Sequence, residues 1–222
     1  MNNFLRNEVP AEYLKGFTKF LNCKIDLQKR VFIPRIETEF WVKKTLKKLS
    51  GDEPRALLDI FAGSGCIGIA ILKNFGNNRL DFVDIDERAI KQIKINLKLN
   101  RIPKERCKIY KSNLFERIRG RRYDIVFANP PYVAEERLNE VQQSVLKHEP
   151  KRAIWGGKRG LVYIRRFLRE AKRFLNPNGI IYLEIDPQQK EEIKQILKRE
   201  NYDRFRFFKD QFKRYRWVEI RR

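Results

Sequence analysis

A glycine-rich turn between an apolar strand and an apolar helix is the feature that most restricts the fold of this chain. Ala56–Phe61 predicts a short buried strand, Ala62–Gly68 supplies the turn, and the apolar residues from Ile67 to Leu72 continue as a helix. Such a turn lets a ligand approach the backbone and the free N–H groups at the start of the helix. The next predicted strand, Arg79–Asp84, ends in an acid, which at this place commonly accepts hydrogen bonds from ribose hydroxyls. The pattern predicts a nucleoside-binding strand–helix unit.

Strand and helix patterns continue to alternate along the rest of the chain. Apolar runs bounded by turn residues predict strands, and apolar positions near helical spacing predict the helices between them. The expected helices are Glu87–Asn100, Leu161–Leu175 and Glu191–Arg199, and the expected strands are Cys107–Tyr110, Tyr123–Ala128 and Ile180–Ile185, followed by two half-buried strands within Arg204–Arg222. This order predicts the α/β class, with a parallel sheet and helices on both faces.

The strand Tyr123–Ala128 stops abruptly at Asn129-Pro130-Pro131-Tyr132. Neither proline can donate a backbone hydrogen bond, so the chain leaves the sheet at its carboxyl edge, where ligands bind in open α/β sheets. The side-chain carbonyl of Asn129 and the main-chain carbonyl of Pro130 are two acceptors for one NH2 group, and Tyr132 offers a flat face to a planar group. The corner therefore suits an amide or a nucleobase amine as substrate, although a Pro-Pro turn with an Asn cap has the same sequence.

The glycine-rich turn differs from the turns that bind dinucleotides or triphosphates. Phe61 occupies the place of the first glycine of a dinucleotide loop, and no phosphate-loop lysine with a Ser or Thr follows. A glycine loop for a nucleoside without phosphates indicates S-adenosylmethionine as the cofactor. After the next strand, Asn113 is expected to read the adenine edge, while Leu114 or Phe115 covers the adenine face.

Composition narrows the class of protein and of partner. Lys and Arg total 50 against 28 Asp and Glu, a net charge of +22, which favours RNA or ribosome contact unless it reflects a generally basic surface. Cys23, Cys66 and Cys107 show neither disulfide nor metal-ligand spacing, and His148 is the only histidine, so no metal site is expected. No signal-peptide core precedes Pro10, and no apolar run reaches membrane-spanning length. We therefore expect a cytoplasmic protein without a membrane partner, in a reducing compartment.

Two further segments carry local predictions. The residues after Pro34 predict a helix with Thr38 as its N-cap, running to Leu49. In the tail, period-two alternation predicts core positions for the aromatic residues. The tail arginines left as candidate phosphate contacts are Arg214, Arg216, Arg221 and Arg222.

Four segments together resemble the release-factor glutamine methyltransferases of the HemK type. They are Pro34–Glu39, Asp59–Gly65, Asn129–Tyr132, and Glu149-Pro150 followed by Gly156-Gly157, in a resemblance that runs from about residue 10 to residue 185. Asn-Pro-Pro-Tyr alone is shared with DNA adenine and rRNA guanine amino-methyltransferases, whereas the combination is much more specific. The resemblance implies a class I, Rossmann-like methyltransferase fold with a mostly parallel seven-stranded sheet and an antiparallel C-terminal strand. It also implies methylation, by S-adenosylmethionine, of the glutamine amide nitrogen (N5) in the Gly-Gly-Gln motif of a peptide chain release factor.

The resemblance assigns roles to particular residues. The glycine loop would contact the methionine part of the cofactor, Asp84 its ribose, and Asn113 with Leu114 its adenine. Asn129 and Pro130 would hold the glutamine amide. The full cofactor set is Phe61, Ala62, Gly63, Ser64, Gly65, Asp84, Asn113, Leu114 and Asn129, and the substrate set is Asn129, Pro130, Pro131 and Tyr132, of which Asn129, Pro130 and Tyr132 are the expected catalytic residues.

Three departures from the family pattern bear on the expected partners. The marker segment begins at residue 34, so the usual N-terminal helical domain that helps grip the release factor is almost absent. Phe61 replaces the first loop glycine, and Asn113 stands where an acid is usual. Residues 1–33 are expected to form a short helix-and-hairpin extension of a methyltransferase catalytic domain at 34–222, in a protein that is monomeric when free.

Two other interpretations of the sequence stay open. One is an RNA or DNA amino-group methyltransferase acting on adenine N6 or guanine N2, which the charge of +22 and Phe61 support. The other is a non-catalytic RNA-binding module on a methyltransferase fold, which the intact glycine loop and Asn129 disfavour. A nucleic-acid substrate predicts binding that falls steeply with salt.

Overall fold

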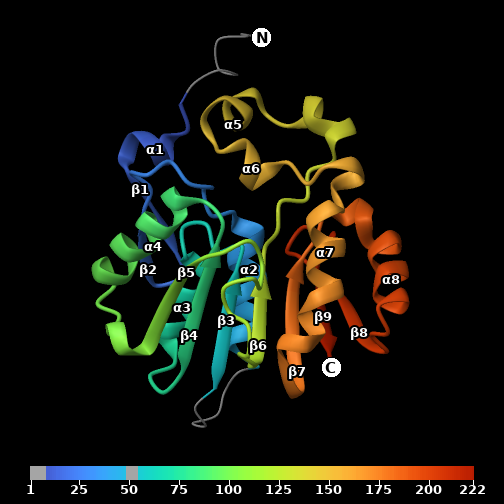
Figure 1. Cartoon of the computed structure of the whole chain (residues 1–222). Helices are drawn as coiled ribbons and strands as arrows, with labels where there is room; N and C mark the ends of the chain where they lie inside the picture. Colours follow the sequence, from blue (N-terminus) through green and yellow to red (C-terminus); the bar gives the residue numbers. More distant parts are fainter. Residues whose placement is uncertain (1–8, 49–54) are drawn as a thin grey trace.

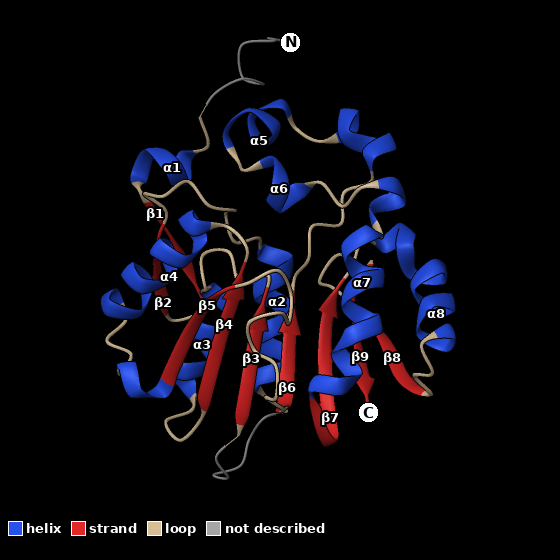
Figure 2. Ribbon diagram, viewed as in Figure 1, coloured by secondary structure: helices blue, strands red, loops and turns tan. Residues whose placement is uncertain are grey.

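A seven-stranded sheet forms the centre of the molecule, in a computed structural model that describes residues 9–48 and 55–222 (Figures 1 and 2). Its strands are β3 (Ala56–Ile60), β4 (Arg79–Asp84), β5 (Cys107–Lys111), β6 (Tyr123–Ala128), β7 (Leu175–Glu184), β8 (Arg204–Lys209) and β9 (Tyr215–Arg221). They are ordered β5-β4-β3-β6-β7-β9-β8, and all pairings are parallel except those of β9, which runs antiparallel to both neighbours. The predicted α/β class, the mostly parallel sheet and the antiparallel strand near the C-terminus are confirmed.

Alternate residues of the central strands face two separate hydrophobic cores, as the period of two in a strand requires. Leu57 and Ile125 belong to one core, and their neighbours Leu58 and Val126 belong to the other. All four side chains are buried. The helices of the first layer are α2 (Ile36–Leu46), α3 (Cys66–Asn74) and α4 (Glu87–Leu99), and those of the second layer are α7 (Val162–Ala171) and α8 (Lys190–Arg199).

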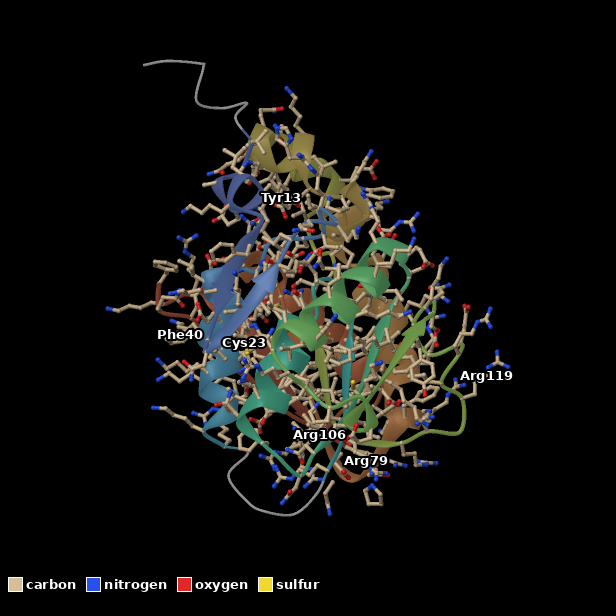
Figure 3. All side chains as sticks on the ribbon, turned by 90° about the vertical axis from the view of Figure 1, so that its left-hand side faces the viewer. Tyr13, Cys23, Phe40, Arg79, Arg106 and Arg119 are labelled. Carbon is tan, nitrogen blue, oxygen red and sulfur yellow. The ribbon has the colours of Figure 1, made fainter. Side chains whose placement is uncertain are left out.

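The N-terminal segment forms a short helix and a hairpin that pack against the first layer. The elements are α1 (Ala11–Lys15), β1 (Phe17–Phe20) and β2 (Cys23–Asp26). Cys23 is buried in the same core as α3 and α4, and Figure 3 shows it on the hairpin side of the molecule. One side chain of α4 and the residue that follows the helix pair with the free edge of β2. Asn96 Oδ1 accepts from the Asp26 N–H at 2.8 Å, and Asn100 Nδ2 donates to the Lys24 carbonyl at 2.8 Å.

Helix α2 begins three residues earlier than predicted. Its N-cap is Arg35, and Thr38 lies inside the first turn, so the prediction of Thr38 as the N-cap is wrong. The reason is a long-range contact: the Thr38 hydroxyl donates to the buried carboxylate of Glu184, 2.7 Å away, instead of capping the helix. The helix ends at Leu46, and the predicted end at Leu49 lies outside the described residues.

The C-terminal part differs from the sequence prediction at two places. Strand β7 begins at Leu175 rather than at Ile180, because a bulge in the pairing with β6 takes up the intervening residues. Arg216 is buried in an ion pair with Asp210 at 3.1 Å, so it is not a candidate phosphate contact. Arg221 also has an acidic partner, Glu219, while Arg214 is exposed.

None of the helices in the described ranges is long and apolar enough to cross a membrane.

Short helices connect the strands and cover the carboxyl edge of the sheet. Above the edge in Figure 1 lie η3 (Glu135–Glu140), α5 (Gln143–His148), α6 (Lys151–Ile154) and η4 (Lys158–Gly160). The other short elements are η2 (Lys104–Arg106), η5 (Lys172–Phe174) and η6 (Pro187–Gln189).

Candidate active site

A cavity of about 670 Å³ opens at the carboxyl ends of β3, β4 and β6. The strand order reverses between β3 and β6, which is where ligands bind in α/β sheets. Residues of α5 and α6 also line the cavity, so these short helices form its roof. Of the residues predicted for the site, Phe61, Ala62, Gly63, Ser64, Asp84, Asn113, Leu114, Asn129, Pro130, Pro131 and Tyr132 line the cavity, and Gly65 does not.

The glycine-rich turn takes left-handed backbone conformations, with φ of 54° at Gly63 and 77° at Gly65. The absence of a side chain serves a different purpose at each of the two positions. A Cβ atom on Gly63 would have no heavy atom within 4 Å, whereas one on Gly65 would lie 3.1 Å from the Cγ1 atom of Ile93. Gly63 therefore leaves room for a ligand at the cavity wall, while Gly65 lets α4 pack against the turn.

Asp84 is held in one orientation by two backbone donors. Its Oδ2 atom accepts from the Gly63 N–H and its Oδ1 atom from the Asp86 N–H, both at 2.8 Å. Burial raises the pKa of Asp84, while these two hydrogen bonds oppose the rise. A carboxylate oxygen has more than one lone pair, so both oxygens can still accept from the hydroxyls of a ribose.

Phe61 adopts a left-handed backbone conformation, with φ of 62°, that is uncommon for a large side chain. Its ring lies edge-on to that of Phe167, with 6.0 Å between the centroids. Glycine adopts this conformation without the steric cost that a Cβ atom brings. With phenylalanine at this position the backbone is strained, and the ring forms an apolar part of the cavity wall.

The Asn113 side chain is engaged by two charged neighbours. Its Nδ2 atom donates to Glu116 at 3.0 Å, and its Oδ1 atom accepts from Arg166 at 3.0 Å. Leu114, next to it, is buried with φ of 51°. The turn is stabilised by the Ser112 hydroxyl, which donates to the Leu114 carbonyl at 2.9 Å. The apolar surface of Leu114 is therefore held firmly, and the amide of Asn113 already has partners on both sides.

Asn129 and the two prolines form the corner that the sequence predicts at the end of β6. Pro130 and Pro131 are buried and Asn129 is half-buried. The Asn129 Nδ2 atom donates to the Thr38 hydroxyl at 3.4 Å, so its Oδ1 atom points away from Thr38. Thr38 itself lines the cavity, which brings the start of α2 to the predicted corner.

Glu184, at the end of β7, is the centre of a buried network that sequence reasoning missed. The Trp41 indole donates to it at 2.6 Å, the Thr38 hydroxyl at 2.7 Å and the Tyr132 hydroxyl at 3.1 Å. Burial raises the pKa of Glu184, and the donors and the charge of Arg216 oppose the rise. The signal that could have found it is the one used for Asp84: an acid at the carboxyl end of a buried strand.

A second buried carboxylate, Glu149, joins the roof of the cavity to the start of α2. Its Oε1 atom accepts from Arg35 Nη2 at 2.5 Å, and its Oε2 atom from the Ile33 N–H at 3.1 Å. Arg35 also lies over the Phe32 ring, 4.5 Å from the centroid. Phe32, Arg35 and the adjacent Pro150 all line the cavity. The two family markers that contain Arg35 and Glu149 thus meet in one wall.

The titratable groups of the cavity favour binding over covalent chemistry. Burial raises the pKa of the Cys66 thiol, so it stays protonated at neutral pH and is a poor nucleophile. Burial and the charge of Glu184 raise the pKa of Tyr132, which therefore remains a hydrogen-bond donor. Within residues 9–48 and 55–222, His, Cys, Asp and Glu side chains form no group of three or more suited to a metal ion.

Solved structures with this fold include several methyltransferases. The ribosomal protein L11 methylase from Lactobacillus delbrueckii subsp. bulgaricus has a TM-score of 0.61 at 18% identity, covering 86% of this chain and 80% of that one. The hMettl16 catalytic domain in complex with MAT2A 3'UTR hairpin 6 has a TM-score of 0.68 at 16% identity, covering 90% and 75%. The protein SMU.776 complexed with SAH has a TM-score of 0.63 at 13% identity, covering 97% and 57%. Identities this low establish the fold alone.

The family model of the methyltransferase small domain matches residues 38–163. With the sheet order and the turn after β3, this match defines a class I S-adenosylmethionine-dependent methyltransferase. The release factor glutamine methyltransferase of Clostridium botulinum is 32% identical over 86% of this chain and 68% of its own length, and that of Streptococcus pneumoniae is 33% identical over 95% and 74%. The chain belongs to the release factor glutamine methyltransferase family. It is therefore an enzyme, a methyltransferase, of a family that uses S-adenosylmethionine.

Proposed function

We propose that this enzyme methylates the side-chain amide nitrogen of the glutamine in the Gly-Gly-Gln motif of a peptide chain release factor. The observation that carries the proposal is the corner at Asn129 and Pro130, which offers two carbonyl acceptors beside a nucleoside-sized cavity. The names of the relatives support the release factor as the partner.

The groups that line the cavity support S-adenosylmethionine as the cofactor. Gly63 leaves open space where a side chain would stand, Asp84 is oriented for ribose hydroxyls, and Leu114 and Phe61 offer apolar surface to an adenine. When bound, the cofactor supplies a methyl group on a sulfonium, which is an electrophile. The residues proposed to hold it are Phe61, Ala62, Gly63, Ser64, Asp84, Asn113, Leu114 and Asn129 on the cavity wall, with Gly65 setting the turn.

The proposed work of the protein on the acceptor is orientation and polarisation. An amide nitrogen is a poor nucleophile because its lone pair is delocalised into the carbonyl group. Asn129 Oδ1 and the Pro130 carbonyl accept hydrogen bonds from its two N–H groups, which shifts electron density toward nitrogen and fixes its direction of attack. Pro131 and Tyr132 wall the pocket around the amide plane. No strong base is needed, because the proton leaves to water once nitrogen has formed its new bond and carries positive charge.

A second candidate function is methylation of an amino group of RNA or DNA. The net charge of +22 favours it, and an exocyclic nucleobase amine would meet the same two acceptors. The two functions differ in salt dependence, since a nucleic-acid substrate gives binding that falls steeply as salt is raised.

The test is transfer of labelled methyl from S-adenosylmethionine to two substrates in parallel. One is a release factor with its Gln→Ala variant in the Gly-Gly-Gln motif, and the other is total RNA. We expect label on the release factor and none on the variant. Label on RNA alone would overturn the glutamine proposal in favour of the second candidate.

A further inference from the structure

We infer that Thr38 and Glu184 are positioning residues, which determine that Asn129 presents its oxygen, and not its NH2 group, to the acceptor. The inference rests on the proposed transfer to an amino group, whether that group is a glutamine amide or a nucleobase amine. Neither residue is required to touch the substrate. They act through the hydrogen-bond chain Glu184–Thr38–Asn129.

The first step concerns the hydrogen between Thr38 and Glu184. The Glu184 Oε2 atom lies 2.6 Å from Trp41 Nε1, and an indole N–H can only donate. The same Oε2 atom lies 2.7 Å from the Thr38 hydroxyl. Since Oε2 is already an acceptor, the hydrogen on the short contact to Thr38 belongs to the hydroxyl. The other oxygen, Oε1, accepts from the Tyr132 hydroxyl at 3.1 Å, so both oxygens of the carboxylate act as acceptors.

The second step concerns the orientation of the Asn129 amide. A hydroxyl has a single hydrogen, and that of Thr38 is committed to Glu184. Toward Asn129, Thr38 can therefore only accept, so the atom 3.4 Å away must be Nδ2. The nitrogen and oxygen of an amide are otherwise easily exchanged by a half-turn of the side chain. The network thus distinguishes two orientations that packing alone distinguishes poorly.

The third step is the consequence for the reaction. In the observed orientation, Oδ1 is directed away from Thr38 and serves as an acceptor for an incoming amino group. After a half-turn, the Asn129 NH2 group would face the NH2 group of the substrate, and two donors would oppose each other. The acceptor pair formed with Pro130 would then be broken. The orientation of one amide therefore decides whether the corner binds an amino group or repels it.

A set of threonine and glutamate variants tests the inference. Thr38→Val removes the hydroxyl at nearly constant shape, and Thr38→Ser retains it. We expect Thr38→Val to lower kcat about 10- to 100-fold, the scale typical of a misplaced catalytic contact. We expect the Kd of S-adenosylhomocysteine to stay within about twofold, and Thr38→Ser to restore most of kcat.

Thr45 offers a matched control on the same helix. It is equally buried, and its hydroxyl donates to the Val42 carbonyl within α2, away from the cavity. Thr45→Val should leave kcat within about twofold of the wild type. If Thr38→Val also retains kcat within twofold, the positioning role is overturned.

A binding measurement tests the orientation of the Asn129 amide directly. In Glu184→Leu, the acceptor of the Thr38 hydrogen is removed, so the Thr38 hydroxyl can donate to Asn129 and favour the half-turned amide. We therefore compare calorimetric Kd values for release factors carrying Gly-Gly-Gln and Gly-Gly-Glu, with S-adenosylhomocysteine present. The preference for the glutamine form should fall about tenfold or more in Glu184→Leu and stay unchanged in Thr45→Val. An unchanged preference overturns the inference, whereas a purely structural role would weaken both forms equally.

Failure of the proposed substrate and failure of this inference are distinguishable. If the wild type methylates RNA and not the release factor, the Thr38 variants are compared on RNA, where the same loss of kcat is expected. If Glu184→Leu does not fold, as judged by its circular dichroism, the Thr38 pair and the Thr45 control decide the outcome. A wild type that methylates neither substrate overturns both proposals.

Discussion

At the scale of single residues, the proposed reaction depends most on Asn129. The residue directly follows β6, and its amide nitrogen donates a hydrogen bond to the Thr38 hydroxyl. Asn129→Ala should lower single-turnover methylation of a release factor at least about 100-fold, because one of two acceptors for the amide is lost. The Kd of S-adenosylhomocysteine, measured by calorimetry, should remain measurable.

The control for Asn129→Ala is Gln195→Ala, which removes an exposed amide from α8. It should turn over at the wild-type rate. Near-normal turnover by Asn129→Ala itself would remove Asn129 from the proposed mechanism.

Phe61 gives a second prediction at this scale. Phe61→Gly and Phe61→Ala both lose the ring contact with Phe167, but only glycine relieves the left-handed backbone. Phe61→Gly should therefore be more stable than Phe61→Ala by about 1 kcal/mol, the reverse of the usual order of the two residues. Urea unfolding of the two variants measures the difference.

The neighbouring Ala62 is the control for this comparison, because its backbone has no positive φ. Ala62→Gly should destabilise the protein through the greater freedom of glycine in the unfolded chain. If Phe61→Ala proves the more stable variant at position 61, the strain assigned to Phe61 is absent.

At the scale of elements, Asp59 couples β3 to the first turn of α3. It is buried, and its Oδ2 atom accepts from the Gly68 N–H at 2.9 Å. Its Oδ1 atom has no hydrogen-bond partner among the described residues. Burial, with a smaller effect of Asp84, raises the pKa of Asp59 from 3.8 to about 8.

This shift predicts how the stability of the protein depends on pH. Between about pH 4 and pH 8, the folded protein retains the Asp59 proton and the unfolded chain does not. The contribution of Asp59 to the free energy of unfolding is therefore present below pH 4 and is lost as pH rises toward 8, by up to about 1.4 kcal/mol per pH unit. Asp59→Asn should gain stability relative to the wild type over this range. Parallel stability curves in urea unfolding from pH 5 to pH 8 would exclude the raised pKa.

At the scale of the whole molecule, the excess of basic residues serves partly internal purposes. Arg106 lies at the end opposite the cavity, near Arg79 in Figure 3. Its guanidinium donates to the carbonyls of Leu72, Phe75 and Asn78, and so binds the last turn of α3 and the residues after it. Arg216 and Arg221 have acidic partners. Basic composition alone is therefore a poor guide to the surface available for RNA.

The net charge of +22 nevertheless predicts self-repulsion in the folded state. Raising NaCl from about 10 mM to 200 mM shortens the screening length from about 30 Å to below 10 Å. The melting temperature should rise over this range, and choline chloride should have the same effect, since screening does not depend on the cation. A melting temperature that falls or stays constant would contradict the prediction.

Much of the fold and of the cavity wall could be predicted from the sequence, because the signals are local. The apolar run of β6 and the two prolines after it lie side by side in the chain, and so do the glycines between β3 and α3. Strand ends of a parallel sheet meet at one edge, so residues 63, 84 and 129 could be expected together. Eleven of the twelve predicted residues line the cavity. Gly65 does not line it, because the position where it would carry a Cβ atom lies against Ile93 of α4.

The partners of the buried carboxylates were decided only by tertiary structure. Glu184 accepts hydrogen bonds from Thr38, Trp41 and Tyr132. Glu149 accepts hydrogen bonds from Ile33 and Arg35. No periodicity or spacing links such distant positions, and Thr38 by itself has the pattern of a helix cap. Because an unpaired charge is costly when buried, each carboxylate forms hydrogen bonds with the donors that the packing places near it. Local chemistry therefore set most of the elements, while the folded core decided the start of α2 and, through desolvation, the hydrogen bonds that orient Asn129.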